Sequence, residues 1–365
     1  MGTPVAERLP PADRATSRLP GAPYDALLVV SFGGPEGPGD VVPVLENVTR
    51  GRGVPRERLL EVAHHYELFG GVSPINAQNR ALVASVEAEL AARGVELPVY
   101  FGNRNWHPLL PDALQQMRDD GVRKALAFFT SAFSSYSGCR QYRENLFEAQ
   151  LSVGEAAPEV ARLRMFHNHP GFVEANADRV RSALGELPDG LRGEAVLAFT
   201  AHSIPVAMAG SCAYEAQLAE TARVVAAEVG IASFDVVYQS RSGPPSMPWL
   251  GPDILDHLRA LAASGVGAVV VSPLGFVSDH LEVLYDLDHE AQELAGELGL
   301  RMVRAGTAGT HPAFVAMIGE LVEERLSPGT ERRTLGRLGA GPDACAPDCC
   351  LPGNGRPSPW DAARA

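Results

Sequence analysis

Four carboxylates recur at near-helical spacing in residues 273–290. Asp279, Glu282, Asp286 and Glu290 fall at i, i+3, i+7 and i+11, which would place them in one stripe on a helix. Like charges held so close repel one another, so the stripe is more easily explained if it handles a cation. The alternative is a solvated acidic face on a surface helix, which is the commoner meaning of this pattern.

A histidine occupies the equivalent place after another apolar run. Residues 195–199 read as a buried strand, and His202 follows that run directly. The acidic stretch likewise begins after the apolar residues 268–271. Ligands of open α/β sheets bind beyond the carboxyl ends of the strands. We therefore expect His202 and Glu282 to face one cleft.

Regular alternation of strand and helix patterns runs along the whole chain. The predicted strands are residues 26–30, 99–102, 125–129, 195–199, 234–238, 268–271 and 302–304. The predicted helices are residues 39–47, 82–93, 111–119, 139–150, 215–229, 254–263, 281–298 and 312–326. This alternation predicts an α/β fold with parallel sheets flanked by helices.

The two halves of the chain also resemble each other. Residues 28–35 match residues 197–205 in form, and residues 125–136 match residues 268–278. We infer two similar Rossmann-like, doubly wound domains with a cleft between them. The predicted divisions are a disordered leader (1–22), an N-terminal domain (23–165), a C-terminal domain (166–327) and a loop-like tail (328–365).

Composition and charge narrow the class of protein. The 365 residues carry a net charge of -13, which argues against a sequence-independent nucleic-acid binder. No apolar run approaches the roughly 20 residues that span a bilayer. The first 22 residues have no apolar core of a secretory signal. We expect a cytoplasmic protein without an integral membrane segment.

Three of the five cysteines lie within six residues of each other. Cys345, Cys349 and Cys350 form a group in the Pro- and Gly-rich tail, where they have no obvious packing role. A metal or iron–sulfur site is one interpretation, and its fourth ligand would be Cys139 or Cys212. The alternative is a redox-active or simply tolerated tail.

Several polar loops could line the predicted cleft. Arg50 and Arg52 lie on a glycine-hinged loop and suit carboxylates or phosphates. Ser73 reads as a helix N-cap before Pro74. Tyr142 belongs to a hydroxyl-rich helix start, and Trp249 offers a flat surface.

The motifs that carry these residues resemble those of the ferrochelatases, which insert ferrous iron into a porphyrin. They are SFGGPE (31–36), GVSPIN (71–76), AHSIP (201–205), PWLGP (248–252) and GFVSDHLE (275–282), in this order. The resemblance covers residues 24–326 and is strongest to actinobacterial members, which act on coproporphyrin III. It implies the class II chelatase fold, with two Rossmann-like domains around the porphyrin.

The resemblance also implies roles for individual residues. His202 and Glu282 would be the Fe²⁺ ligands and catalytic pair, and Asp279, Asp286 and Glu290 a relay for iron or protons. The implied porphyrin contacts are Ser31, Phe32, Arg50, Arg52, Ser73, Tyr142 and Trp249. Many bacterial relatives have tyrosine where this chain has Phe32, and a phenyl ring cannot coordinate iron.

Some members of the family hold a [2Fe–2S] cluster on three C-terminal cysteines and one internal cysteine. The resemblance therefore implies such a cofactor on Cys345, Cys349 and Cys350, with Cys139 as the first choice for the fourth ligand and Cys212 as the alternative. It further implies transient contact with neighbouring enzymes of haem biosynthesis.

Three other functions remain open at this point. They are a protoporphyrin IX ferrochelatase, a chelatase for another divalent metal, and a non-catalytic porphyrin or haem carrier. A carrier needs no proton acceptor, so the pair of His202 and Glu282 favours an enzyme.

Overall fold

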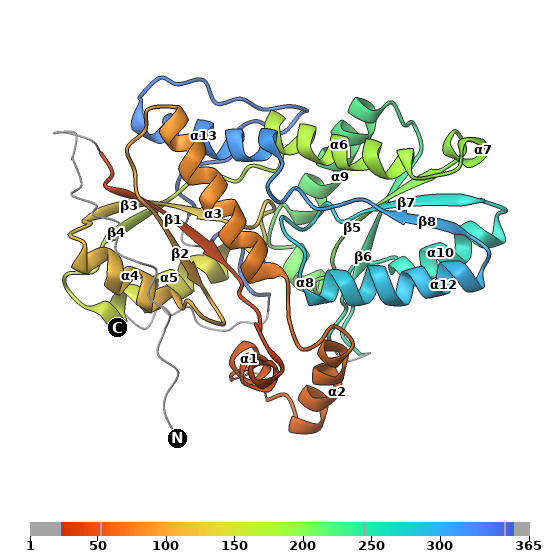
Figure 1. Ribbon diagram of the computed structural model, residues 1–365, viewed down its shortest axis with the longest axis horizontal. Coiled ribbons are helices and arrows are strands. Elements are labelled where there is room, and N and C mark those ends of the chain that lie inside the picture. Colours follow the sequence, from red (N-terminus) through yellow and green to blue (C-terminus); the bar gives the residue numbers. More distant parts are fainter. Residues whose placement is uncertain (1–22, 52, 244–245, 347, 354–365) are drawn as a thin grey trace.

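Two four-stranded parallel sheets organise the molecule (Figure 1). The computed structural model describes residues 23–51, 53–243, 246–346 and 348–353. The first sheet has the order β2-β1-β3-β4 and the second has the order β6-β5-β7-β8. In each sheet, the second strand along the chain lies at one edge, followed by the first, third and fourth. This shared strand order confirms the predicted pair of similar Rossmann-like units.

The strands and helices have the following bounds. The strands are β1 (Ala26–Ser31), β2 (Val99–Asn103), β3 (Lys124–Phe129), β4 (Glu159–Arg162), β5 (Val196–His202), β6 (Phe234–Gln239), β7 (Ala268–Ser272) and β8 (Arg301–Arg304). The main helices of the first half are α1 (Val41–Val48), α2 (Arg56–Glu67), α3 (Ile75–Ala92), α4 (Leu110–Asp119) and α5 (Gln141–Val153). Those of the second half are α6 (Pro170–Gly185), α9 (Tyr214–Val229), α10 (Ile254–Ala263), α12 (Gln292–Glu297) and α13 (Pro312–Leu326). Short elements complete the list: η1 (Pro38–Asp40), η2 (Tyr136–Arg140), α7 (Asp189–Arg192), α8 (Val206–Ala209), α11 (Leu281–Val283) and η3 (Leu284–Ala291).

Both faces of each sheet are buried, as expected for parallel strands between helical layers. Along β1, Leu27 and Val29 enter one apolar cluster, whereas Leu28 and Val30 enter another. This two-residue alternation follows directly from strand geometry. It explains why the strands appear in the sequence as continuous apolar runs.

One apolar core is shared by the two sheets. It contains Leu27 and Val29 of the first sheet together with Leu197 and Phe199 of the second. Helix α13 packs against both α3 and α6 and so joins the two halves (Figure 1). The proposed division of the chain near residues 165–166 stays a prediction, because each half has an apolar cluster of its own but the largest cluster spans both halves.

The tail after α13 crosses back over the molecule without helix or strand in its described part. Arg164, which is fully buried, forms a two-point ion pair with Glu324, with both distances 2.8 Å, and donates to the carbonyl oxygen of Arg333. The amide of Asn168 donates to the carbonyls of Leu338 and Gly339. These bonds bring the tail to the first sheet.

Two buried histidines lie beside this ion pair. Burial, reinforced by the charge of Arg164, lowers the pKa of His167 to about 4 and that of His169 to about 3. Because the folded-state values lie below the unfolded value, the unfolded chain binds protons first as the pH falls. The free energy of unfolding should thus decline below pH ~6.5, by up to about 1.4 kcal/mol per pH unit for each histidine.

Urea unfolding at pH 7.0 and 5.0 would measure this decline. His167→Gln should make the decline between pH 7.0 and 5.0 shallower by the share that His167 contributes, and His64→Gln, on the exposed side of α2, is the control. An unchanged slope in His167→Gln would contradict the assignment.

Candidate functional site

His202 and Glu282 approach each other beyond the carboxyl end of the second sheet. His202 is the last residue of β5, and Glu282 lies in α11, after the turn that follows the adjacent strand β7. The Nε2 atom of His202 lies 3.8 Å from Oε2 of Glu282, and the two side chains are 34% and 51% exposed. A base and a carboxylate thus meet at a position open to a ligand.

The backbone around His202 selects its tautomer. Nδ1 is hydrogen-bonded to the carbonyl oxygen of Ser203, which can only accept, so Nδ1 carries the proton. In the neutral ring, Nε2 then has a free lone pair on the side of Glu282. The buried hydroxyl of Tyr214 donates to the carbonyl oxygen of His202 at 2.9 Å and fixes the end of the strand.

Two further side chains of this site escaped the sequence interpretation. His280 Nδ1 lies 3.8 Å from the same Oε2 of Glu282, and burial lowers the pKa of His280. Tyr66 of α2 is half-buried beside the site, and its partial burial together with the charge of Glu282 raises its pKa. The His280 signal was present in the motif DHLE, whereas Tyr66 approaches only through tertiary packing.

The acidic stripe continues from Glu282 on a π-helical segment, η3. A π-helix has i→i+5 hydrogen bonds and therefore a wider turn than an α-helix. Residues four apart, as Glu282, Asp286 and Glu290 are, consequently stay near one face. Asp279 lies before the helix, which begins at Leu281. The prediction that all four carboxylates lie on one helix is therefore wrong for Asp279.

Asp286 is the most perturbed carboxyl of the stripe. Burial raises its pKa to about 7 against the opposing hydrogen bond from Ser240, and the charge of Glu282 adds to the rise. Gln239 Nε2 also donates to Asp286, at 3.1 Å. Burial likewise raises the pKa of Glu290. The end of β6 therefore holds a carboxyl that can change charge near neutral pH.

The predicted porphyrin contacts divide into exposed and buried residues. Phe32 is 40% exposed at the end of the first sheet, and Arg50 is exposed after α1. Ser31 and Ser73 are 0% and 4% exposed, and Tyr142 is 5% exposed. Arg52 lies outside the described residues.

Two of these residues differ from what the sequence predicted. Ser73 is not the N-cap of α3, because that position is Pro74 and no side chain caps the helix. The backbone of Trp249 forms an isolated antiparallel β-bridge with that of Pro205, and the indole ring of Trp249 packs on Gly243. A Cβ at Gly243 would lie 2.3 Å from Nε1 of Trp249.

Arg104 joins the exposed Phe32 to the buried Tyr142 and was absent from the sequence interpretation. Its guanidinium carbon lies 5.6 Å from the ring centre of Phe32 and 4.4 Å from that of Tyr142. Nε of Arg104 donates to the side chain of Asn145 at 2.8 Å. A planar cation beside an open aromatic ring suits a carboxylate of a flat ligand.

Four of the five free thiols lie together where the tail reaches the first sheet. Thiol hydrogen bonds link Cys139 to Cys345 and to Cys350, and Cys349 Sγ is 3.5 Å from Cys350 Sγ. The thiol of Cys212 donates to carbonyls of its own turn, those of Met208 and Ala209, and burial together with the charges of Cys349 and Cys139 raises its pKa. Among the described residues, no three His, Cys, Asp or Glu side chains already form a metal-holding group.

Arg162 contacts two of these four thiols. It is 7% exposed, and its guanidinium donates to Cys345 Sγ at 2.9 Å and to Cys139 Sγ at 3.5 Å. Its Nε is buried without a hydrogen-bond partner in the part of the chain that the structure describes. The hydrogen bond with Cys139 and burial raise the pKa of the Cys345 thiol.

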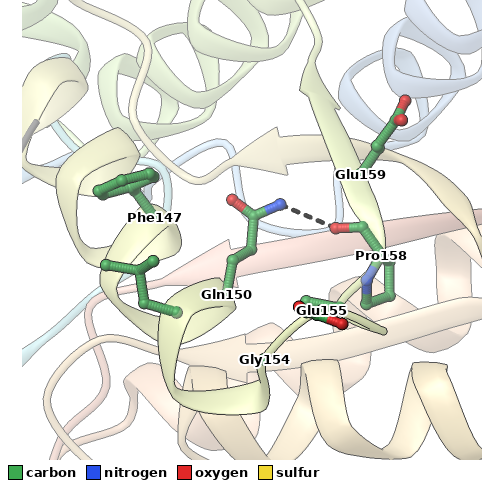
Figure 2. A pocket seen from close by; sticks show the side chains of 8 residues that line it. Phe147, Gln150, Gly154, Glu155, Pro158 and Glu159 are labelled. Atoms are coloured by element: carbon green, nitrogen blue, oxygen red, sulfur yellow. Dashed lines mark hydrogen bonds between the residues drawn. The ribbon is translucent and has the colours of Figure 1, made fainter. Parts of the chain in front are cut away.

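A hollow of about 420 Å³ lies elsewhere, between the end of α5 and β4 (Figure 2). Gln150 crosses it and donates to the carbonyl oxygen of Pro158 at 2.8 Å. Phe147 and Leu151 make its lining largely apolar. None of the predicted site residues lines it, so it is separate from the site at His202 and Glu282.

Comparisons with known proteins bear on the family to which this chain belongs. The ferrochelatase family model matches residues 24–326. A ferrochelatase of Rhodopirellula baltica is 56% identical over 92% of this chain and 95% of its own length. Coproporphyrin III ferrochelatases of Nocardia farcinica and Mycolicibacterium smegmatis are 55% and 54% identical, covering 90% and 86% of this chain and 97% and 93% of their own lengths.

A solved structure supports the fold alone. SirB from Bacillus subtilis with Fe³⁺ has a TM-score of 0.52 at 12% identity and covers 83% of this chain and 95% of its own. In the described residues, no helix is long and apolar enough to cross a bilayer.

Proposed function

This chain belongs to the ferrochelatase family, and we propose that it inserts ferrous iron into coproporphyrin III at a site formed by His202 and Glu282. The observation that carries the proposal is the free Nε2 lone pair of His202, held 3.8 Å from a carboxylate at the end of two neighbouring strands. Relatives that act on coproporphyrin III are 51–55% identical over most of the chain, which supports this substrate.

The chemistry divides between the two side chains. Insertion of Fe²⁺ releases both pyrrole N–H protons of the porphyrin, so the site needs a proton acceptor and a group that draws iron from water. Nε2 of the neutral His202 ring, whose Nδ1 carries the proton, can act as the proton acceptor. The carboxylate of Glu282 can replace water around Fe²⁺, a role for which oxygen ligands are suited.

The remaining acids form a proposed path toward this pair. Asp286 and Glu290 follow Glu282 along η3 at intervals of four residues, and burial raises the pKa of each. They would relay iron or protons to the site. Asp279 was grouped with them from the sequence, but its ion pair with Arg304 at 3.1 Å favours a positioning role.

Phe32, Arg50, Arg52 and Trp249, with Arg104 added, are the proposed porphyrin contacts. The rings would lie against the macrocycle and the arginines near its carboxylates. Ser31, Ser73 and Tyr142 are buried behind this surface and would act through it. Because Phe32 has no donor atom, the loop after β1 contributes shape and not an iron ligand.

We also propose that Cys139, Cys345, Cys349 and Cys350 hold a [2Fe–2S] cluster. Their donor chemistry fits, since such clusters take four thiolates. The unpartnered Nε of the buried Arg162 supports this assignment, because a guanidinium in that position suits added negative charge. Cys139 is favoured over Cys212 because its thiol pairs with those of Cys345 and Cys350, whereas the Cys212 thiol is bonded to backbone carbonyls of its own turn.

Replacement of a cluster ligand should remove the visible colour of the purified protein. Cys139→Ser is expected to lower bound iron and acid-labile sulfide by at least about tenfold, because three thiolates do not complete the cluster. Cys212→Ser is the matched control and should retain both. Full cluster content in Cys139→Ser would contradict the ligand assignment.

The cellular setting is part of the same proposal. Five free cysteines fit a reducing compartment, which supports the cytoplasm. Leu60, Leu68 and Val72, on and after α2, are 49%, 54% and 41% exposed. We propose that these exposed apolar side chains take part in transient contact with the neighbouring enzymes of haem biosynthesis.

Anaerobic incubation with Fe²⁺ and either coproporphyrin III or protoporphyrin IX tests the activity. The absorption spectrum should show fast metallation of coproporphyrin III. Preference for protoporphyrin IX would overturn the substrate. Tight binding with no metallation of either porphyrin would favour a carrier.

A further inference from the structure

The second turn of α3 belongs to the first half of the molecule but is bonded to the second half. Gln78 Nε2 donates to Oδ2 of Asp279 at 3.1 Å, and the backbone N–H of Asp279 donates to Oε1 of Gln78 at 2.8 Å. One primary amide thus satisfies both a side chain and a backbone group of the other half. Such a paired contact fixes orientation as well as distance.

The next residue of the helix makes a second connection. Asn79 Nδ2 donates to Ser31 Oγ at 2.8 Å, and Ser278 Oγ donates to Asn79 Oδ1 at 3.3 Å. Asn79 and Ser31 have no exposed surface, and Ser278 is 6% exposed. The buried side-chain amide of Asn79 is thus hydrogen-bonded through its nitrogen to the first half of the molecule and through its oxygen to the second half. Breaking either bond would leave a buried polar group without a partner, so the two halves are held in one relative position here.

The residues bonded to Gln78 and Asn79 are neighbours, in the sequence, of residues in the proposed site. Ser31 directly precedes Phe32, and Asp279 lies three residues before Glu282. Arg304 of β8 donates to the other oxygen of Asp279 at 3.1 Å, so this carboxylate is held from both halves. The start of α3 therefore connects the loop carrying Phe32 to the segment carrying Glu282.

We propose that Gln78 and Asn79 are positioning residues, which set the relation between the Phe32 side and the Glu282 side of the porphyrin site. The inference rests on the proposed function of His202 and Glu282, and it gives Asp279 a structural task in place of a relay. A reacting geometry misplaced by about 1 Å can lose a hundredfold in rate. The effect of loosening these bonds should thus appear in catalysis beyond any effect on stability.

An exchange of partners tests this directly. In Gln78→Glu, two carboxylates face each other, and the hydrogen bond to Oδ2 is lost. The double variant Gln78→Glu/Asp279→Asn restores both bonds, because the new amide donates to the new carboxylate and the backbone N–H of residue 279 still has an acceptor. Gln78→Ala removes both bonds without repulsion. Ser85→Ala is the control, since the hydroxyl of Ser85 donates to the carbonyl oxygen of Ala81 within α3 itself.

The readouts are kcat and KM for the porphyrin at saturating Fe²⁺, with thermal unfolding measured for each variant. Gln78→Glu should lower kcat/KM by about tenfold or more, Gln78→Ala by less, and Ser85→Ala not at all. The double variant should return to within about threefold of the parent.

Two outcomes would overturn the inference. One is unchanged kcat/KM in Gln78→Glu and Gln78→Ala. The other is a double variant no better than Gln78→Glu at equal thermal stability, which would mean that the charge of Asp279 itself is needed. Failure of the proposed function would look different, because the parent protein would then metallate no porphyrin.

Discussion

Replacement of His202 by alanine is expected to lower kcat for iron insertion by about a thousandfold, within the range found for loss of a positioned acid or base. The reason is the tautomer: Nδ1–H is committed to the carbonyl of Ser203, so Nε2 is the ring atom free to accept a pyrrole proton. The binding of porphyrin should change little, because the imidazole supplies only a small part of the contact surface. Loss of porphyrin fluorescence under anaerobic conditions measures the rate, and fluorescence titration without iron measures the affinity.

His64→Ala provides the control for this variant. His64 also pairs with a carboxylate, Glu67 at 2.8 Å, but it does so on the exposed side of α2. Its loss should leave kcat unchanged. Near-full insertion activity in His202→Ala would mean that another group, such as His280, accepts the proton.

The strand ends that carry His202 and Glu282 could be predicted from the sequence, because buried parallel strands have a recognisable pattern. Both faces of β5 and β7 are buried, so the strands appear as apolar runs, and the first polar residues after them must lie at the carboxyl edge. His202 and Glu282 could be recognised in this way. The same reasoning failed for β4, because this strand has four residues and its first and last are Glu159 and Arg162, which leaves no apolar run to detect.

Other parts of the site depend on contacts that no local pattern records. Arg104 and Tyr66 come from segments that carry no motif of their own, and only packing brings them to Phe32 and Glu282. The π-helical turn of η3 was also hidden, because its sequence differs little from that of an α-helix. Asp279 was misplaced for a different reason: the spacing suggested a helical stripe, but Asp279 precedes the helix and its partners are Gln78 and Arg304.

Glu282→Gln should show how much of the activity depends on the negative charge of Glu282, because the substitution removes the charge and keeps the size of the side chain. The amide has nearly the size of the carboxylate, so porphyrin affinity should be retained, whereas the attraction for Fe²⁺ should fall. We expect kcat/KM for iron to drop by at least about a hundredfold, with Asp286→Asn giving a smaller loss because Asp286 lies further along η3.

The double variant His202→Ala/Glu282→Gln then shows whether the two side chains act together. Since Nε2 and Oε2 are 3.8 Å apart and face the same ligand position, removal of one should leave the other with little to contribute. The combined loss should therefore be close to that of the worse single variant, as for residues that act as a unit. Fully additive losses would mean instead that proton acceptance and iron capture proceed as independent steps, with His202 and Glu282 serving different stages of insertion.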